Sequence, residues 1–260
     1  MINGINSREM ILEILLEIEE GEHSHVAIRN ALSKYQFLPK QDRAFITRVC
    51  EGTLEYRIQI DYIINSFSKV TVDKMKPAIR EILRSAVYQL KYMDSVPDSA
   101  VCNEAVKLAQ RKGFYNLKPF VNGVLRTIAR EMDQVRFPQK EDDLLKYLSV
   151  KYSMPEVLVT RWLEAYGEET TEKILADFLT EHPLTIRCRT YLNSKEEVIK
   201  SLESQGVHVA PAPYLSYAYS ISEFNHILAL DAFIKGKIVV QDVSSMLVAE
   251  VADPKKGDYV

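Results

Sequence analysis

The chain has 260 residues, of which 47% are hydrophobic and 27% charged, and its formal net charge is −3. No run of about 18 apolar residues occurs, which argues against a membrane span, and the N-terminus lacks the basic and apolar regions of a secretory signal. The three cysteines are far apart and odd in number, so neither a disulfide framework nor a zinc site is expected. We therefore expect a cytoplasmic protein with reduced thiols, no membrane contact and no metal.

The charge is divided unevenly along the chain. Residues 1–140 contain 21 Lys and Arg against 17 Asp and Glu, whereas the remainder contains 12 and 19. A weakly basic half joined to an acidic half fits a nucleic-acid contact on the first half. Statistical scatter explains the same numbers equally well.

Residues 7–130 have the spacing of consecutive amphipathic helices joined by short connections. Ser7 is the expected cap of the first helix and Gly21 its end, while Pro77 and Pro119 open two later helices. No alternating pattern interrupts this stretch, so we predict an all-α domain over residues 1–138. The buried stripes are predicted to include Met10, Ile14, Ile46, Val49, Ile60, Ile63, Ile79, Leu83, Val101, Ala105, Val121 and Leu125.

The pattern changes after a polar linker at residues 130–143. Ser153 and Glu156 have capping-box spacing and predict a helix that Gly167 ends. Residues 184–189 alternate like a strand, and Ser194 is the expected cap of a helix that ends at Gly206. Short strands are expected near residues 207–209, 217–221 and 238–241. We predict a helical linker and a small α/β module over residues 139–235.

Residues 236–260 predict a strand, a short helix, a turn and the first residues of another strand at Asp258. Parallel strands occur in strand–helix–strand units, so we interpret this segment as the incomplete start of a parallel sheet. Residues 241–245 join a strand end to a helix start, where such sheets hold ligands. Capping by Asp242, Ser244 or Ser245 explains the same residue types.

The sequence contains no convincing catalytic or metal-binding residue. Cys50 and Cys102 lie on apolar stripes, and strand alternation places Arg187 and Arg189 on the face opposite Cys188, so all three thiols are expected to be structural. None of the histidines has a partner at ligand spacing. These histidines are His23, His25, His182, His208 and His226.

Basic residues in the helical half are candidates for phosphate contacts. A solvated surface is the alternative for each of them. A run of glutamates at the N-terminus is expected to be solvated or to face a partner, and to repel nucleic acid. The basic candidates are Arg43, Arg48, Arg57, Arg111, Lys112, Lys118, Arg126 and Arg130, and the acidic stripe is Glu9, Glu13, Glu17, Glu19, Glu20 and Glu22.

Several segments, in this order, resemble known families. Glu81–Pro97, Val101–Ala109 and Phe120–Arg126 resemble the helical NusB-like domain. Tyr152–Trp162, His182–Arg187, Val240–Ser245 and Asp253–Val260 resemble the front part of the Sun/Fmu family of RNA cytosine-C5 methyltransferases. The ordered set covers nearly the whole chain and is more specific than any one motif.

The resemblance implies a NusB-like helical bundle, then a small α/β module that leads into a truncated Rossmann-like methyltransferase sheet over residues 236–260. It implies the RNA-recognition portion of an S-adenosylmethionine-dependent enzyme that modifies 16S ribosomal RNA. In this family the cofactor loop and two catalytic cysteines follow the point where this chain ends. The resemblance therefore implies that this fragment is inactive alone, binds no cofactor and lacks its C-terminal catalytic domain.

Two other functions remain open. A non-enzymatic, RNA-binding antitermination factor of the NusB type fits residues 1–130 but leaves Ser153–Val260 without a role. A structural interaction module would use the acidic stripe as its docking face.

Overall fold

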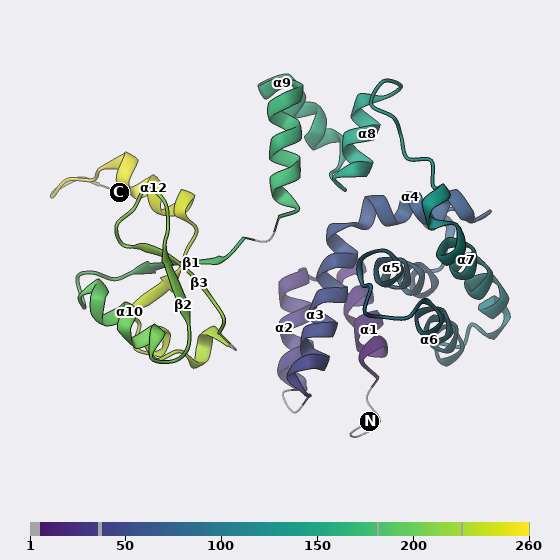
Figure 1. Cartoon of the computed structure of the whole chain (residues 1–260), viewed down its shortest axis with the longest axis horizontal. Helices are drawn as coiled ribbons and strands as arrows, with labels where there is room; N and C mark the ends of the chain where they lie inside the picture. The colour runs from purple at the N-terminus through teal and green to yellow at the C-terminus, as the bar shows by residue number, and fades with distance from the viewer. Residues whose placement is uncertain (1–5, 36–37, 181, 225, 260) are drawn as a thin grey trace. The chain divides into compact units, whose positions relative to one another are not determined.

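A computed structural model describes residues 6–35, 38–180, 182–224 and 226–259 of the chain (Figure 1). The chain forms two compact units that divide between Leu179 and Thr180. Among the described residues, no helix combines the length and apolar character needed to cross a membrane. The helices of the first unit are α1 (Ser7–Glu19), α2 (Ser24–Lys34), α3 (Lys40–Glu55), α4 (Arg57–Phe67), α5 (Pro77–Tyr92), α6 (Asp98–Arg111), α7 (Lys118–Glu131), α8 (Leu144–Lys151) and α9 (Glu156–Phe178), with 3-10 turns η1 (Val72–Lys74), η2 (Tyr115–Leu117) and η3 (Met132–Gln134).

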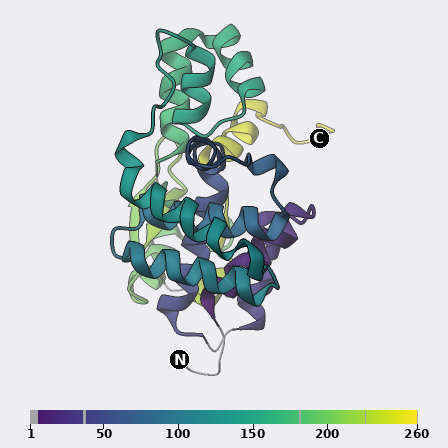
Figure 2. The same ribbon diagram turned by 90° about the vertical axis from the view of Figure 1, so that its right-hand side faces the viewer.

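Helix α5 is the centre of the helical bundle. It packs against α1, α3, α4, α6 and α7, and α6 and α7 lie side by side (Figures 1 and 2). Pro77 occupies its first turn, where a missing N–H costs no hydrogen bond. Ile79, Ile82 and Leu83 are fully buried within one continuous core that every helix from α1 to α7 joins. The predicted all-α domain is confirmed.

The expected cap of the first helix is wrong by one residue. Asn6, not Ser7, precedes α1 in extended conformation, and its Oδ1 accepts a hydrogen bond from the N–H of Arg8 at 2.9 Å. Asn and Ser are about equally good caps, so the sequence did not separate them. Gly21 follows the helix with a φ of 113°, a conformation that glycine adopts without strain.

The connection between the bundle and α9 differs from the prediction in two ways. Helix α8 was not foreseen, although Asp143 caps it by accepting from the N–H of Lys146 at 2.9 Å. Ser153 does not cap α9; its Oγ accepts from the N–H of Ile58 at 3.0 Å and so satisfies the first turn of α4. The predicted break at Gly167 is confirmed, since its backbone is non-helical with a φ of 73°.

The second unit contains a four-stranded sheet in the order β2-β3-β1-β4. Every pairing among its described strands is antiparallel, with Ile186 opposite Tyr219 on one side and Val240 on the other. Helices α10 and α11 join the core of one sheet face. The elements are β1 (Leu184–Cys188), α10 (Lys195–Glu203), β2 (His208–Pro211), β3 (Ala218–Ser222), η4 (Ile227–Ala229), α11 (Asp231–Ile234), β4 (Ile238–Val240) and α12 (Val243–Ala252).

The expected parallel arrangement of the last strand is wrong. Strand β4 runs antiparallel to β1 at the edge of the small sheet, so it completes this module rather than starting a parallel one. Its residue pattern fits either direction, because burial on one face does not specify the partner. Asp258 and Tyr259, where a further strand was expected to begin, belong to no strand; Val260 lies outside the described residues.

Candidate nucleic-acid interface

The candidate basic residues lie on two pairs of helices. Arg43 and Arg48 belong to α3 and Arg57 opens α4, while the other five extend from the end of α6 along α7. On α7, Lys118 and Arg126 are eight residues apart and thus separated by about 80° around the helix. The fold therefore distributes the candidates over a broad surface of the bundle rather than concentrating them in one cleft.

The acidic stripe of α1 neutralises part of the α6 end. Arg111 Nη1 lies 3.6 Å from Glu9 Oε2, and Lys112 Nζ lies 3.2 Å from Glu13 Oε1. These glutamates were expected to be solvated or to face a partner, and to repel nucleic acid; their pairing with Arg111 and Lys112 was not predicted. Exposed ion pairs of this kind stabilise a protein by only about 0–1 kcal/mol, so a phosphate competes readily for either cation.

Several candidates have no carboxylate partner among the described residues. Arg48 is exposed, Lys118 is half-buried, and Arg126 donates only to the neutral Asn122 Oδ1 at 2.9 Å. Arg43 and Arg57 are half-buried, and each has a buried Nε without a hydrogen-bond partner. Arg130 differs, because it donates two hydrogen bonds to Glu131.

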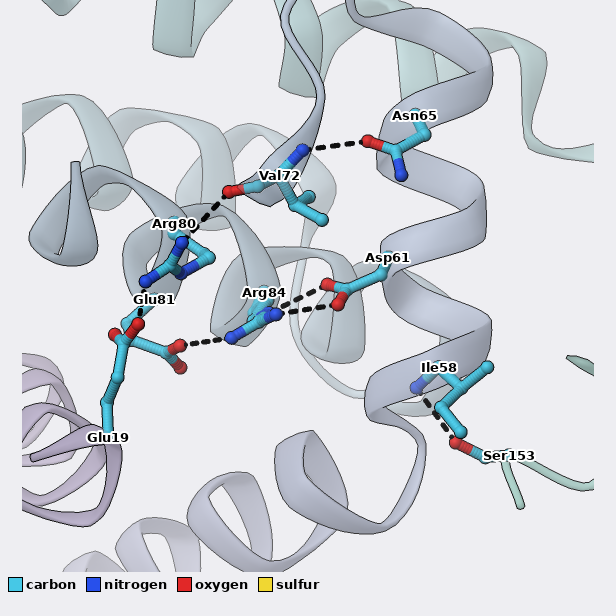
Figure 3. Close-up of polar contacts among 9 residues, drawn as sticks. All are labelled: Glu19, Ile58, Asp61, Asn65, Val72, Arg80, Glu81, Arg84 and Ser153. Carbon is cyan, nitrogen blue, oxygen red and sulfur yellow. Dashed lines mark hydrogen bonds and ion pairs between the residues drawn. The ribbon is translucent and has the colours of Figure 1, made fainter. Parts of the chain in front are cut away.

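A network of charged side chains joins α1, α4 and α5 inside the bundle (Figure 3). Arg84 donates from Nε and Nη2 to both oxygens of Asp61, at 2.7 and 2.6 Å, and from Nη1 to Glu81 Oε1 at 2.6 Å. Glu81 is fully buried and its second oxygen has no partner. Such a network fixes helix positions but is expensive to desolvate.

A second part of the network ties α5 to α1 and to the turn before α5 (Figure 3). Arg80 forms an ion pair with Glu19 and donates from Nη1 to the Val72 carbonyl oxygen at 3.1 Å. The Val72 N–H in turn donates to Asn65 Oδ1 at 2.9 Å. Glu19 is therefore engaged inside the bundle, and the expectation of a solvated side chain was wrong for it.

A polar junction that the sequence pattern did not predict joins the bundle to α8. Gln59 is buried, and its Nε2 donates to the carbonyl oxygens of Val150 and Lys151, each at 3.1 Å. Its Oε1 accepts from the hydroxyl of Tyr92, whose ring lies 4.2 Å from that of Tyr56 between centroids. The only sequence signal was a lone glutamine between Ile58 and Ile60.

The cysteines and histidines offer no reactive centre. All three thiols are buried and free, and burial raises the pKa of Cys188 to about 11. The burial of all three thiols agrees with a structural role. Within the described ranges, no group of three or more His, Cys, Asp and Glu side chains is arranged to hold a metal ion.

Comparison with known proteins finds a matching family for each half of the chain. Residues 5–130 match the NusB family, and residues 154–227 match the family described as Methyltr_RsmF/B-like, ferredoxin-like domain. A transcription antitermination protein NusB from Dictyoglomus thermophilum is 33% identical over 130 residues, which are 50% of this chain and 85% of that protein. The helical half is therefore a NusB-family domain.

Longer proteins match both halves. A probable ribosomal RNA small subunit methyltransferase B from Bacillus subtilis is 32% identical over 253 residues, covering 97% of this chain and 56% of that protein. The crystal structure of PH0851 has the same fold over 97% of this chain and 56% of its own, with a TM-score of 0.71 and 24% identity. The chain thus spans a little over half the length of these relatives.

The two matches define the class: a chain in which a NusB-family domain precedes a methyltransferase-type ferredoxin-like domain. In this domain order the chain is similar, over nearly its whole length, to ribosomal RNA small subunit methyltransferases B, and it resembles the Sun/Fmu family.

Proposed function

We propose that this chain is the RNA-recognition portion of an S-adenosylmethionine-dependent enzyme that methylates carbon 5 of a cytosine in 16S ribosomal RNA. The observation that carries the proposal is the presence of both domains, in order, in one chain that aligns over 97% of its length with the B. subtilis methyltransferase. An antitermination factor accounts for the first half only, since the NusB relative aligns with 50% of the chain.

The second unit has apolar surface suited to a further domain. Val248 and Val251 on α12 are 68% and 84% exposed, and Val240 on the edge strand β4 is 42% exposed. Exposed apolar side chains on a helix beside an unpaired strand edge are typical of a covered surface. We propose that the residues after β4 lead into a Rossmann-like catalytic domain that packs there. The first domain limit stays at 138, and the limit expected at 235 moves past β4, because that strand pairs with β1.

The described residues do not fit the methyl donor. Gln241 and Asp242 connect β4 to α12, and this connection lacks the glycines that let a backbone approach a nucleotide cofactor. Asp242 caps α12, because its Oδ1 accepts a hydrogen bond from the N–H of Ser244 at 2.8 Å. We derive no methyl-transfer step from these residues. Calorimetry with S-adenosylmethionine is expected to detect no binding to the 260-residue chain. Tight binding would contradict the proposal that the cofactor is bound by another domain.

The helical unit supplies the phosphate contacts in this proposal. Arg48, Lys118 and Arg126 are available at once, because no carboxylate among the described residues pairs with them. When RNA binds, the ion pairs of Arg111 with Glu9 and of Lys112 with Glu13 are replaced by contacts to phosphate oxygens. Arg43, Arg57 and Arg130 complete the proposed set.

The test is the salt dependence of RNA binding. Each phosphate contact adds about 0.7 to the slope of log affinity against log salt for a single strand, and about 0.9 for a B-form duplex. The triple variant Arg48→Gln, Lys118→Gln, Arg126→Gln is expected to lose about two units of slope on single-stranded RNA. The number-matched control is Lys173→Gln, Lys200→Gln, Lys235→Gln, which removes exposed lysines elsewhere. Equal losses in the two triples would contradict this surface.

The glutamates provide an independent check. Glu9→Gln with Glu13→Gln frees Arg111 and Lys112, so RNA affinity is expected to rise and the salt slope to steepen. Unchanged affinity would remove those two cations from the proposed set.

A further inference from the structure

A small cavity lies where α4, α5, the linker and α8 meet. Its volume is about 260 Å³, and its lining includes Lys91, Phe137, Pro138, Tyr147 and Lys151. Typical ligand pockets measure about 300–1,000 Å³. The cavity is therefore suited to part of a polymer, such as one nucleotide, rather than to a complete dinucleotide or methyl-donor cofactor.

The lining is cationic, although the whole chain is acidic. Among the described residues, two lysines and no carboxylate line the cavity. Lys151 is already engaged, because its Nζ donates to Tyr147 Oη at 2.7 Å and to Glu172 Oε1 at 3.0 Å. Lys91 has neither a hydrogen bond nor an ion pair with any described residue. It is the cation available to an anionic ligand.

Lys91 is held in place by aromatic rings rather than by an anion. Its Nζ lies 5.5 Å from the ring centroids of both Tyr92 and Phe137. Burial lowers the pKa of Lys91, and the negative charge of Asp133 opposes this effect. Cation–π contact leaves the positive charge unneutralised, so an incoming phosphate recovers part of the desolvation cost.

The residues that line the cavity are held in place by contacts within the protein. Tyr62 stacks on Phe137 with centroids 5.7 Å apart, and its hydroxyl donates to the carbonyl oxygen of Arg136 at 2.6 Å. Gln59, which also lines the cavity, holds the end of α8 through its two backbone hydrogen bonds. A preformed site binds with a smaller entropy cost than one that must be assembled.

We propose that this cavity, the linker pocket, binds one nucleotide of single-stranded RNA, with the phosphate at Lys91 and the base against Pro138 and Tyr147. The proposal rests on the RNA-binding function above and adds the place where an unpaired nucleotide is held. Single-stranded RNA is typically recognised by cations along its backbone and by apolar or aromatic surfaces against its bases.

The neighbouring surface limits the site to about one nucleotide. A wider groove of about 730 Å³ shares Phe137 and Pro138 with the pocket and adds the cations Arg136 and Lys146. Asp142 and Asp143 line the same groove, so its charges balance. We therefore expect adjacent nucleotides to pass across it without tight contact.

Photo-crosslinking locates the bound strand directly. A short single-stranded RNA with 4-thiouridine at each position in turn, bound to the 260-residue chain at low salt, is expected to crosslink to the peptide spanning residues 137–151. Crosslinks confined to α3, α6 and α7 would overturn the linker pocket while leaving the RNA-binding function intact. An absence of RNA binding at low salt would overturn both.

Substitution of Lys91 measures the same contact. Lys91→Met is expected to reduce the salt slope by about 0.7, which corresponds to about a fivefold loss of affinity at 0.1 M salt. Lys91→Arg is expected to retain binding, and Lys173→Met, on an exposed lysine of α9, is the matched control. The melting temperature of Lys91→Met is not expected to fall, because burial disfavours the charged form of this lysine. Unchanged affinity in a folded Lys91→Met protein would refute the pocket.

Discussion

The two units of this chain differ in what they bury and what they expose. The helical unit encloses charge: Glu81 is fully buried and Arg84 nearly so. Both units expose some large apolar side chains, such as Val157 and Phe178 in the helical unit, but the shorter sheet unit exposes more of them, including Val248 and Val251. Exposed apolar surface on a small module indicates a unit that awaits a partner.

The difference also shows which interactions give each unit its unique arrangement. In the helical unit, Arg84 on α5 bridges to Asp61 on α4 through two charge-assisted hydrogen bonds, and a third joins it to Glu81 on its own helix. Apolar packing alone tolerates small shifts between helices, whereas a bidentate guanidinium contact has a defined geometry. The sheet unit relies on backbone pairing and a small apolar core instead.

The largest expected effect comes from breaking the buried network. Arg84→Ala leaves the carboxylate of Glu81 buried without a partner, and such losses typically cost about 3–5 kcal/mol. Urea unfolding followed by helical circular dichroism measures the change. Because the network lies within the first unit, unfolding of the sheet unit is expected to remain unchanged.

The control removes both charges from the interior. Glu81→Leu with Arg84→Leu replaces a desolvated pair by apolar groups, a change that is often neutral or stabilising. Asp61 retains 21% side-chain exposure and is therefore able to be hydrated. We expect the double variant to recover most of the stability lost in Arg84→Ala. A double variant less stable than the single one would show that the network itself stabilises the bundle.

The next effect tests the close packing of the tyrosine cluster in the helical unit. A Cβ at Gly52 would overlap the outer ring atoms of Tyr88, which is buried beside Tyr56 and Tyr92. Gly52→Ala is therefore expected to destabilise the unit by about 1–3 kcal/mol, the usual cost of overpacking. Adding Tyr88→Leu should restore space and recover part of the loss in thermal unfolding. If Tyr88→Leu recovers none of the stability lost in Gly52→Ala, the overlap with Tyr88 is not the cause of the loss.

Sequence periodicity predicted the helical unit well because its elements are long and amphipathic. Pro77, Pro119, Gly21 and Gly167 marked real starts or breaks, since their backbone restrictions act locally. Helix α8 was missed because its eight residues give too short a periodic signal.

Contacts between residues that lie far apart in the sequence could not be predicted from local patterns. Ser153 has perfect spacing for a local capping box, yet it caps α4 from 95 residues away. Arg111 and Lys112 were identified as available cations, yet α1 brings glutamates beside them. The direction of β4 was likewise decided by its neighbour β1 and not by its own residues.

A smaller effect is expected at the junction of α8 and α9. Glu172 accepts hydrogen bonds from Lys151 and Tyr152, each at 3.0 Å, and from Lys140 at 3.3 Å. The hydrogen bond from Lys151 is the main reason that the pKa of Glu172 falls below its ordinary 4.5. Its stabilising contribution is therefore present above pH 4.5 and is lost as the pH falls through the lowered folded-state value.

Glu172→Gln tests that contribution. The variant is expected to lose at most about 1 kcal/mol at neutral pH, as is usual for a partly exposed ion pair. The difference from the wild type should vanish in acid, when the native carboxyl is protonated. Denaturant unfolding at neutral and acidic pH measures both values. A difference that persists in acid would mean that packing, rather than charge, accounts for the effect.

The smallest effect is expected on the exposed face of α12. Val248→Ser with Val251→Ser should change the stability of the 260-residue chain by no more than about 0.5 kcal/mol per site, because neither side chain is buried. Leu202→Ala, at a fully buried site in the same unit, is expected to cost about 2–5 kcal/mol. In a longer protein that covers α12, the valine pair would instead lower the melting temperature. A large loss already in the 260-residue chain would mean that this face is covered within the chain itself, and the contrast between the two units would fail.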